Sequence, residues 1–357
     1  MKILGAELQR IELRLRRPLA TASGTHDRRP GLLLHLRGED GTRGHGEATP
    51  LPHFGTESLE AAKAGLRAVC SKLPGRELEE PGANLEELAA SCGLGPCARW
   101  ALDCALHDLV ARQRGVPITA LLGGRRPPQS LAASALLFGA SPEALVDSAR
   151  KAREQGFRTV KLKLGSPDFA RDRVRVAAVR NTLGAEVAIR LDANGAWSLD
   201  QATERIRALS EFEPELVEQP LPALQLRQLA ELRRRVCVPI AADESVGGRE
   251  DLQRVLEAGA ANVVVLKPAR LGGLRRSVEL GREARRAGME VVVTSLLDGA
   301  VSLAGALQVA ASLGEGPLAC GLATSALLLR DVARPPRVAL GRIWLPRPAG
   351  LGVAPPP

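Results

Sequence analysis

The sequence predicts an α/β fold, a (β/α)8-type barrel preceded by an α+β capping domain. From about residue 130 onward, strand-like and helix-like segments alternate at a spacing of roughly 25 residues, which is typical of successive βα units. The residues before that point show a different order, with alternating strands first and helical patterns afterwards. The chain of 357 residues is long enough for one large barrel and one smaller domain.

The first 60 residues predict an antiparallel meander, in which GLLLHLRGEDGTRGHGEATP (31–50) is a strand, a turn at Glu39-Asp40-Gly41 and a second strand. Residues 57–125 follow a helical pattern that ends near the Gly123-Gly124 break. We expect residues 1–125 to form the capping domain. The tail 326–357, which carries Pro and Gly at intervals, is expected to return to it.

The barrel is expected to span residues 126–325 and to contain eight strands, each followed by a helical segment, with a shortened eighth helix. The expected strands are 130–137, 157–164, 187–193, 215–219, 238–244, 261–267, 289–295 and 318–324. Barrel enzymes keep their active sites at the C-terminal ends of such strands. The chemistry of this chain is therefore sought at those ends.

Composition argues against a nucleic-acid partner. Aromatic residues make up only 2% of the chain and Tyr is absent, so aromatic stacking platforms for single strands are scarce. The net charge of +9 would suit a polyanion, but the arginines are interleaved with Glu and Asp and form no basic tail. Apolar residues at 45% and charged residues at 25% describe an ordinary globular protein.

The sequence also predicts a cytoplasmic protein without a membrane partner. No apolar run of about 18 residues is present, and the N-terminus alternates like a strand rather than like a signal peptide. The six cysteines form no CxxC pair and no zinc spacing, which favours reduced thiols. A homo-oligomer is compatible with the sequence.

Lysine is rare and is placed selectively. Of the 49 basic residues only seven are lysine, and the last three, Lys161, Lys163 and Lys267, all lie in strand-like segments. Lys161 and Lys163 share one face of the strand TVKLKLG (159–165) by its period of two. An ammonium group can lose its proton when it is desolvated or crowded by cations, whereas a guanidinium does not. The placement reflects either snorkelling at strand ends or proton-transfer chemistry.

Three carboxylates end the third, fourth and fifth predicted strands. Asp192, Glu218, Asp243 and then Lys267 follow one another at intervals of 26, 25 and 24 residues, each close to one βα unit. They therefore occupy equivalent positions on adjacent strands and converge at the barrel mouth. Any single acid could be a helix N-cap or a surface residue, but three in phase and flanked by lysines favour a shared site.

Carboxylates at close quarters repel one another unless a cation lies between them, and an all-oxygen site fits Mg²⁺, with Mn²⁺ also possible. Such an ion can bind a substrate carboxylate and stabilise the enediolate that remains when the neighbouring carbon loses its proton. A lysine crowded by a second lysine and by this cation has its pKa drawn towards neutrality, so it can act as a base. The pattern predicts a small-molecule carboxylate bound between Lys163 and Lys267.

The segments KLK, LDANGAW, VEQP, AADES and VLKP resemble the enolase superfamily, in its muconate-cycloisomerase-like subgroup, and the resemblance covers nearly the whole chain. It implies three ligands of Mg²⁺, which are Asp192, Glu218 and Asp243. It also implies that Lys163 and Lys267 are paired acid/base groups. By the same resemblance, Lys161 would hold the substrate carboxylate or the enediolate, and Asn194 would support the metal site.

Within that subgroup several reactions remain open. No His follows His107, so the His–Asp dyad of mandelate-racemase-like relatives is absent from the barrel. Dipeptide epimerases usually carry Asp-x-Asp on the eighth strand for the substrate ammonium, and residues 320–324 contain no carboxylate here. The segments GHGEATPLPHF (44–54) and ACGLAT (319–324) instead resemble o-succinylbenzoate synthases of the menaquinone pathway.

That resemblance implies a Mg²⁺-assisted syn-dehydration in which Lys163 removes the proton and later assists the departure of hydroxide, while Lys267 stabilises the enediolate from the other face. N-succinylamino acid racemase and dipeptide epimerase, which use the same lysines, remain as alternatives. A non-catalytic or nucleic-acid-binding basic protein is a more distant one.

Departures from the family pattern fall where specificity is set. Residues 294–299 read TSLLDG where relatives often have Ser-Ser followed by Glu-Ser or Glu-Thr, and GLAT replaces the frequent GLDT. The loop 21–31 either closes over the site or is a plain surface connection, and Phe54 either walls the pocket or simply packs. The predicted substrate-binding residues are Asn194, Ser134, Thr294, Ser295, Thr324 and Arg28.

Overall fold

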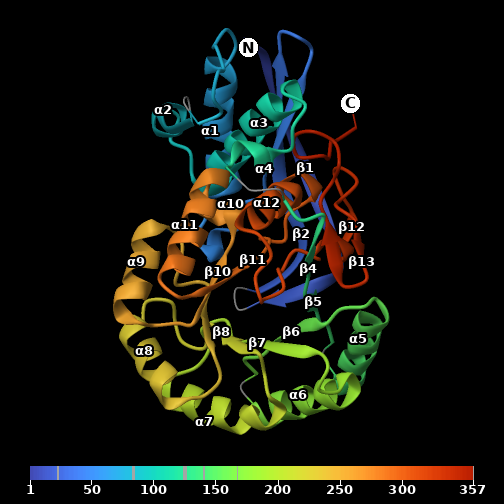
Figure 1. The fold of residues 1–357 in the computed structure, drawn as a ribbon, viewed down its shortest axis with the longest axis vertical. Helices are drawn as coiled ribbons and strands as arrows, with labels where there is room; N and C mark the ends of the chain where they lie inside the picture. Colours follow the sequence, from blue (N-terminus) through green and yellow to red (C-terminus); the bar gives the residue numbers. More distant parts are fainter. Residues whose placement is uncertain (22–23, 83–84, 124–126, 140, 167, 357) are drawn as a thin grey trace.

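The structure is a computed structural model that describes all residues except 22–23, 83–84, 124–126, 140, 167 and 357. It contains an antiparallel four-stranded sheet near the N-terminus and a parallel seven-stranded sheet that curls inside a layer of helices (Figure 1). The expected α/β class, with a barrel-type parallel sheet and an N-terminal antiparallel sheet, is confirmed.

The N-terminal sheet has the strand order β12-β1-β2-β3. Its meander consists of β1 (Ile3–Thr21), β2 (Gly24–Gly38) and β3 (Arg43–Ala48). The expected turn connects β2 to β3, and Gly41 within it adopts a φ of 82°, which glycine tolerates without strain. A short helix, η1 (Pro52–Phe54), follows β3.

The expected helical region contains four helices, α1 (Leu59–Lys72), α2 (Leu85–Ser91), α3 (Pro96–Gln113) and α4 (Ile118–Leu121). The central helix α3 packs against β3 at very short range. A Cβ on Gly46 would lie 1.8 Å from the carbonyl oxygen of Ala101, and one on Gly44 would lie 2.3 Å from that of Ala105. Only glycine at these two positions lets the helix and the strand approach this closely.

The parallel sheet has the order β11-β10-β9-β8-β7-β6-β5. Its strands are β5 (Ala135–Leu136), β6 (Thr159–Lys163), β7 (Ala188–Asp192), β8 (Leu216–Glu218), β9 (Ile240–Ala242), β10 (Val263–Leu266) and β11 (Glu290–Val293). Most of their residues are buried, as expected for a parallel sheet covered on its outer face by helices.

The covering helices alternate with the strands (Figure 1). They are α5 (Pro142–Glu154), α6 (Phe169–Leu183), α7 (Leu199–Leu209), α8 (Leu226–Arg235), α9 (Arg249–Ala258), α11 (Leu274–Arg286) and α12 (Ala300–Leu313). Two short helices, η2 (Ser210–Phe212) and α10 (Pro268–Leu271), lie in connections. Side-chain caps define several starts; Ser198, for example, forms a capping box with Gln201 at the start of α7.

The first and eighth expected strands differ from the prediction. The expected strand 130–137 is divided into β4 (Ser130–Ala132) and β5, because β4 pairs with the tail strand β14 (Arg342–Trp344) instead of the barrel sheet. The expected strand 318–324 is reduced to two parallel bridges, Ala133–Cys320 and Thr294–Gly321. Those bridges still join the two edges of the curled sheet. A three-residue helix, η3 (Ser325–Leu327), stands where the shortened eighth helix is expected.

The C-terminal tail contacts both parts of the chain. β12 (Leu328–Arg330) pairs with β1 of the N-terminal sheet, and Gly350 forms a bridge with Pro117. β13 (Val338–Ala339) and β14 form a sheet with β4. The domain boundaries at 125/126 and 325/326 stay predictions. Within the described residues, no helix combines the length and apolar character that crossing a membrane requires.

Candidate active site

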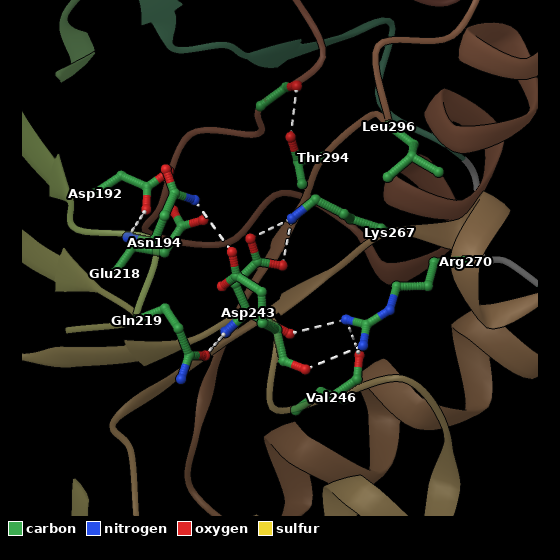
Figure 2. A network of polar contacts seen from close by, with 12 residues as sticks. Asp192, Asn194, Glu218, Gln219, Asp243, Val246, Lys267, Arg270, Thr294 and Leu296 are labelled. Carbon is green, nitrogen blue, oxygen red and sulfur yellow. Dashed lines mark hydrogen bonds and ion pairs between the residues drawn. The ribbon is translucent and has the colours of Figure 1, made fainter. Parts of the chain in front are cut away.

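Three buried carboxylates lie side by side at the ends of adjacent strands. Asp192 ends β7, Glu218 ends β8, and Asp243 directly follows β9. The sheet register places Asp192 opposite Glu218, and Glu218 opposite Ala241. Their exposed fractions are 1%, 3% and 2%. The structure therefore brings together the three acids that were predicted as metal ligands (Figure 2).

Lysines neutralise these acids. Lys161 Nζ lies 2.8 Å from Asp192 Oδ2 and 2.7 Å from Glu218 Oε2, so one ammonium bridges two carboxylates. Lys267 Nζ donates to both carboxylate oxygens of Asp243 (Figure 2). Lys163 takes a different partner, since its Nζ donates to Asn194 Oδ1 at 3.1 Å. All three lysines line the same pocket, which explains why Lys161 and Lys163 share a strand face.

The charges of this group are strongly interdependent. Burial raises the pKa of Glu218 to about 8; Lys161 opposes this shift, while Asp192 and Asp243 add to it. Burial also acts to raise the pKa of Asp243, but the ammonium groups of Lys267 and Lys161 hold it below its ordinary value. For Lys161, burial favours the neutral amine, yet the carboxylates of Asp192, Glu218 and Asp243 prevail and raise its pKa. The charge of Asp243 thus depends on the two ammonium groups, whereas burial beside Asp192 and Asp243 favours the neutral form of Glu218.

In the described part of the chain, no three His, Cys, Asp or Glu side chains are arranged to hold a metal ion. At the barrel mouth, the ammonium groups of Lys161 and Lys267 lie against the three carboxylates instead. The donor set nevertheless suits a hard divalent ion, because every candidate ligand atom is a carboxylate oxygen. Glu218 Oε1 is buried and has no hydrogen-bond partner among the described residues, so one acceptor remains available.

Two residues beside the acids adopt left-handed backbone conformations. Asn194 has a φ of 46° and Gln219 a φ of 39°, values that are uncommon for residues with a side chain. Asn194 N donates to Asp192 Oδ1 at 3.0 Å, and its Nδ2 donates to Glu244 Oε1 at 3.1 Å. Gln219 Oε1 accepts from the backbone N of Asp243 at 2.9 Å. These contacts fix how the strand ends leave the sheet.

Gln219 and Arg270 were not predicted as site residues. Arg270 donates to the backbone carbonyls of Asp243, Glu244 and Val246 at 3.0 to 3.3 Å, and so holds the segment that follows Asp243 (Figure 2). Both side chains form hydrogen bonds with backbone groups about one βα unit away in the sequence. Because any residue type supplies such backbone groups, these contacts leave no recognisable motif in the sequence. The only signal was the presence of Gln219 in the quoted VEQP segment.

The pocket above the acids has a volume of about 110 Å³. The predicted substrate-binding residues Ser134, Asn194, Thr294, Ser295 and Thr324 all line it. Its remaining wall is largely apolar and comes from the segment after β3 and from the strand ends and loops of the barrel. The apolar lining residues are Leu51, Phe54, Leu136, Leu296, Leu297 and Ala323.

Phe54 connects the N-terminal sheet region to the lysines. It belongs to η1, and its ring centre lies 4.4 Å from Lys267 Nζ and 5.6 Å from the guanidinium carbon of Arg270. Cations over an aromatic face are attracted by the ring quadrupole. Phe54 therefore lines the pocket and also packs against the ammonium group of Lys267.

Arg28 does not line this pocket. Its half-exposed guanidinium forms ion pairs with Glu12 at 3.6 Å and Asp27 at 3.7 Å. A role for Arg28 in substrate binding stays a prediction. The segment 21–31, expected as either a closing loop or a surface connection, belongs to strand β2 from Gly24 onward, and residues 22–23 lie outside the described residues.

The neighbouring Arg29 is buried and connects the N-terminal sheet to the pocket wall. Its guanidinium donates to the carbonyl oxygens of Thr49 at 2.6 Å, Pro50 at 2.9 Å and Leu296 at 3.2 Å. Burial lowers the pKa of Arg29, although Asp298 opposes this shift. Asp298 itself accepts from Thr49 Oγ1 at 2.9 Å and from the backbone N of Leu296 at 3.0 Å. Leu296 is therefore held in the wall by contacts from two directions.

We expect Arg29→Met to lower the free energy of unfolding by about 3 kcal/mol, because it leaves three carbonyl groups and the buried Asp298 without their cation. Arg28→Met is the matched control and should change this free energy by less than about 1 kcal/mol, since its ion pairs are exposed. Urea unfolding measures both. Equal losses in the two variants would contradict the role assigned to Arg29.

Comparison with known proteins supports a common origin for this arrangement. Residues 6–123 match the family model described as the mandelate racemase / muconate lactonizing enzyme N-terminal domain, and residues 144–357 match the enolase C-terminal domain-like model. The o-succinylbenzoate synthase of Thermobifida fusca is 41% identical over 249 residues, which cover 69% of this chain and 73% of that protein.

The N-succinylamino acid racemase of Thermus thermophilus is 34% identical over 313 residues, which cover 87% of this chain and 83% of that one. Among solved structures, the dipeptide epimerase from Cytophaga hutchinsonii, complexed with Mg and the dipeptide D-Ala-L-Val, superposes with a TM-score of 0.91 at 25% identity. That superposition covers 100% of this chain and 96% of the epimerase. The chain belongs to the enolase superfamily, in its muconate-cycloisomerase-like subgroup.

Proposed function

We propose that this protein catalyses the Mg²⁺-dependent removal of a proton from the carbon next to a substrate carboxylate, with Lys163 and Lys267 as the acid/base pair. The observation that carries the proposal is their placement. Lys163 ends β6 and Lys267 follows β10, so the three strands that carry the acids lie between them. Both ammonium groups nevertheless line one pocket, and a substrate bound there meets a lysine on each side.

Asp192, Glu218 and Asp243 would hold the ion, for which Mn²⁺ is an acceptable substitute. A bound ion would supply positive charge to these acids and to the substrate carboxylate. Lys161 would then be released from Asp192 and Glu218 and could pair with that carboxylate. The Mg found in the related dipeptide epimerase supports this assignment.

Lys163 is the base in this proposal. As a neutral amine it takes the proton from the carbon, and as an ammonium it then gives that proton to a departing hydroxide, which leaves as water. Asn194 Oδ1 accepts from Lys163 Nζ and so orients it. Lys267, from the other face, stabilises the negative charge that develops on the substrate. The electron pair of the broken C–H bond forms the new double bond as the C–O bond breaks, and the proton leaves with the hydroxide as water. No further reactant is needed.

The most favoured reaction is the syn-dehydration catalysed by o-succinylbenzoate synthases. The Thermobifida fusca enzyme of that name is 41% identical over 249 residues, and the apolar part of the pocket wall suits the cyclohexadiene ring of that substrate. N-succinylamino acid racemisation is the second candidate, favoured by the relative from Thermus thermophilus. Dipeptide epimerisation is less favoured, because residues 320–324 offer no carboxylate to a substrate ammonium.

The test of the reaction offers three substrates side by side with Mg²⁺: the succinyl-bearing cyclohexadiene carboxylate, N-succinylamino acids, and L-Ala-L-Glu. We expect kcat/KM to be highest for the dehydration, followed by absorbance spectroscopy of the aromatic product. Racemisation and epimerisation are followed by polarimetry. Appreciable turnover of the dipeptide alone would overturn the proposed reaction.

Lys163→Ala should lower kcat at least about 10³-fold, within the range that general acid–base groups supply. The fold should persist, because Lys163 makes one side-chain hydrogen bond in a partly exposed position. The matched control is Lys151→Ala, an exposed lysine on α5 that pairs with Asp147, and its kcat should equal that of the wild type. Circular dichroism checks the fold, and retained turnover in Lys163→Ala would remove this lysine from the mechanism.

Mg²⁺ should stabilise the protein, by about 2.7 kcal/mol at a free concentration 100 times the dissociation constant. Glu218→Gln should abolish most of this gain, because the neutral amide supplies less charge to the ion. Thermal unfolding with Mg²⁺ and with a chelator measures both. The exposed Glu204→Gln is the control and should keep the full gain; an equal gain in Glu218→Gln would exclude Glu218 as a ligand.

A further inference from the structure

The proposed function gives no role to Glu244, which directly follows Asp243 in the chain. Its side chain does not line the catalytic pocket. Its backbone is nevertheless held firmly, because Arg270 Nη2 donates to the carbonyl oxygen of Glu244 at 3.0 Å and Arg270 Nη1 to that of Asp243 at 3.3 Å (Figure 2). A side chain that starts from a fixed point outside the pocket can influence a bound substrate only through a neighbour.

Asn194 is the neighbour that connects Glu244 to the proposed base. Its Nδ2 donates to Glu244 Oε1 at 3.1 Å, and its Oδ1 accepts from Lys163 Nζ at 3.1 Å. Unlike Glu244, both Asn194 and Lys163 line the pocket. The position of the amide is fixed from its own backbone, where a φ of 46° and the hydrogen bond from Asn194 N to Asp192 Oδ1 set the path of the chain.

The two contacts of this amide determine which way round it lies. A side-chain amide offers an acceptor at its oxygen and donors at its nitrogen. Turned through 180°, Asn194 would direct its N–H groups at the ammonium group of Lys163 and its oxygen at the carboxylate of Glu244. Donor would then face donor and acceptor would face acceptor, so both hydrogen bonds would be lost. The carboxylate of Glu244 therefore keeps the amide oxygen directed at Lys163.

This direction matters for a lysine that acts as a base. A neutral amine carries two N–H hydrogens and one lone pair, and the lone pair must face the C–H bond that it breaks. When one N–H is donated to Asn194 Oδ1, rotation about the Cε–Nζ bond of Lys163 is restricted. Fewer directions then remain open to the lone pair, and a reacting group that is held in the right orientation reacts faster.

We propose that Glu244 is a positioning residue for the proton transfer and that it acts through Asn194 on Lys163. The inference rests on the proposed function, in which Lys163 is the base. It requires an acceptor oxygen at Glu244 Oε1 and does not require the negative charge. Glu244 Oε2 is buried without a hydrogen-bond partner among the described residues, so no contact in that part of the chain needs the second oxygen. A neutral amide at this position should therefore serve nearly as well.

Steady-state kinetics test the inference, with whichever of the three substrates above the wild type turns over fastest. Glu244→Leu should lower kcat about tenfold, the worth of one hydrogen bond, and should leave KM within about twofold. Glu244→Gln keeps an acceptor and should retain kcat within about twofold. The exposed Glu204→Leu on α7 is the control and should behave as the wild type. Wild-type kcat in Glu244→Leu, or an equal loss in Glu244→Gln, overturns the inference; if Glu244→Leu fails to fold, Glu244→Ala replaces it.

A second background separates positioning from a merely structural role. Asn194→Gly removes the amide and suits the positive φ at this position. In that background Glu244→Leu should lower kcat by less than about twofold, because the contact through which Glu244 acts is already absent. The same loss in both backgrounds would contradict the inference. The Mg²⁺-dependent rise in the unfolding temperature should be equal in Glu244→Leu and the wild type, and its loss would assign Glu244 to the metal instead.

A crystal structure of Glu244→Leu provides a readout that does not depend on turnover. We expect it to lack the contact between Lys163 Nζ and Asn194 Oδ1, which is 3.1 Å in the wild type. An unchanged contact would overturn the inference. The proposed function and this inference fail in different ways. Absence of turnover of all three substrates by the wild type refutes the former, whereas an active wild type with unchanged kinetics in Glu244→Leu refutes the latter alone.

Discussion

The architecture depends on one electrostatic constraint, the burial of three carboxylates on adjacent strands. Asp192, Glu218 and Asp243 are each less than 4% exposed, and the parallel register gives them no room to separate. Such a group is stable only with cations placed between or beside the acids. The structure meets this need with Lys161 and Lys267. Under the proposed function, a metal ion would share this role with the two ammonium groups.

The N-terminal sheet is joined to the barrel by a second buried acid group. Glu47 accepts from the backbone N of Gly299 at 2.6 Å and of Ser302 at 3.2 Å, at the start of α12. Burial, with a smaller contribution from Asp298, raises the pKa of Glu47 to about 8. Together with Arg29, these contacts hold β3 against the segment that carries Leu296. The pocket wall is therefore shared between the segment that follows β3 and the barrel.

Sequence spacing was sufficient to predict the strands β6 to β11 and the convergence of the acids, because a βα unit has a nearly constant length and strand ends meet at one rim. It could not show that Lys161 bridges Asp192 and Glu218, since a period of two identifies a face but not a partner. The division of the first strand depended on pairing between β4 and β14, which are about 200 residues apart in the chain. The burial of Arg29 beside the exposed Arg28 likewise followed from contacts with distant carbonyl groups.

The pocket wall away from the acids carries hydroxyl groups and apolar side chains. Its hydroxyl groups opposite the acids are already engaged: Ser295 Oγ lies 2.8 Å from Thr324 Oγ1, and Thr294 Oγ1 donates to the carbonyl of Gly321 at 2.9 Å. Leu296, Leu297 and Ala323 add no charge to that wall. These hydroxyl groups therefore offer little to a charged group, and under the proposed function the carboxylate beside the reacting carbon would lie at the lysine end of the pocket. The contact of Arg29 with the carbonyl of Leu296 helps to maintain the shape of this wall, which would limit the size of the group that the far end accepts.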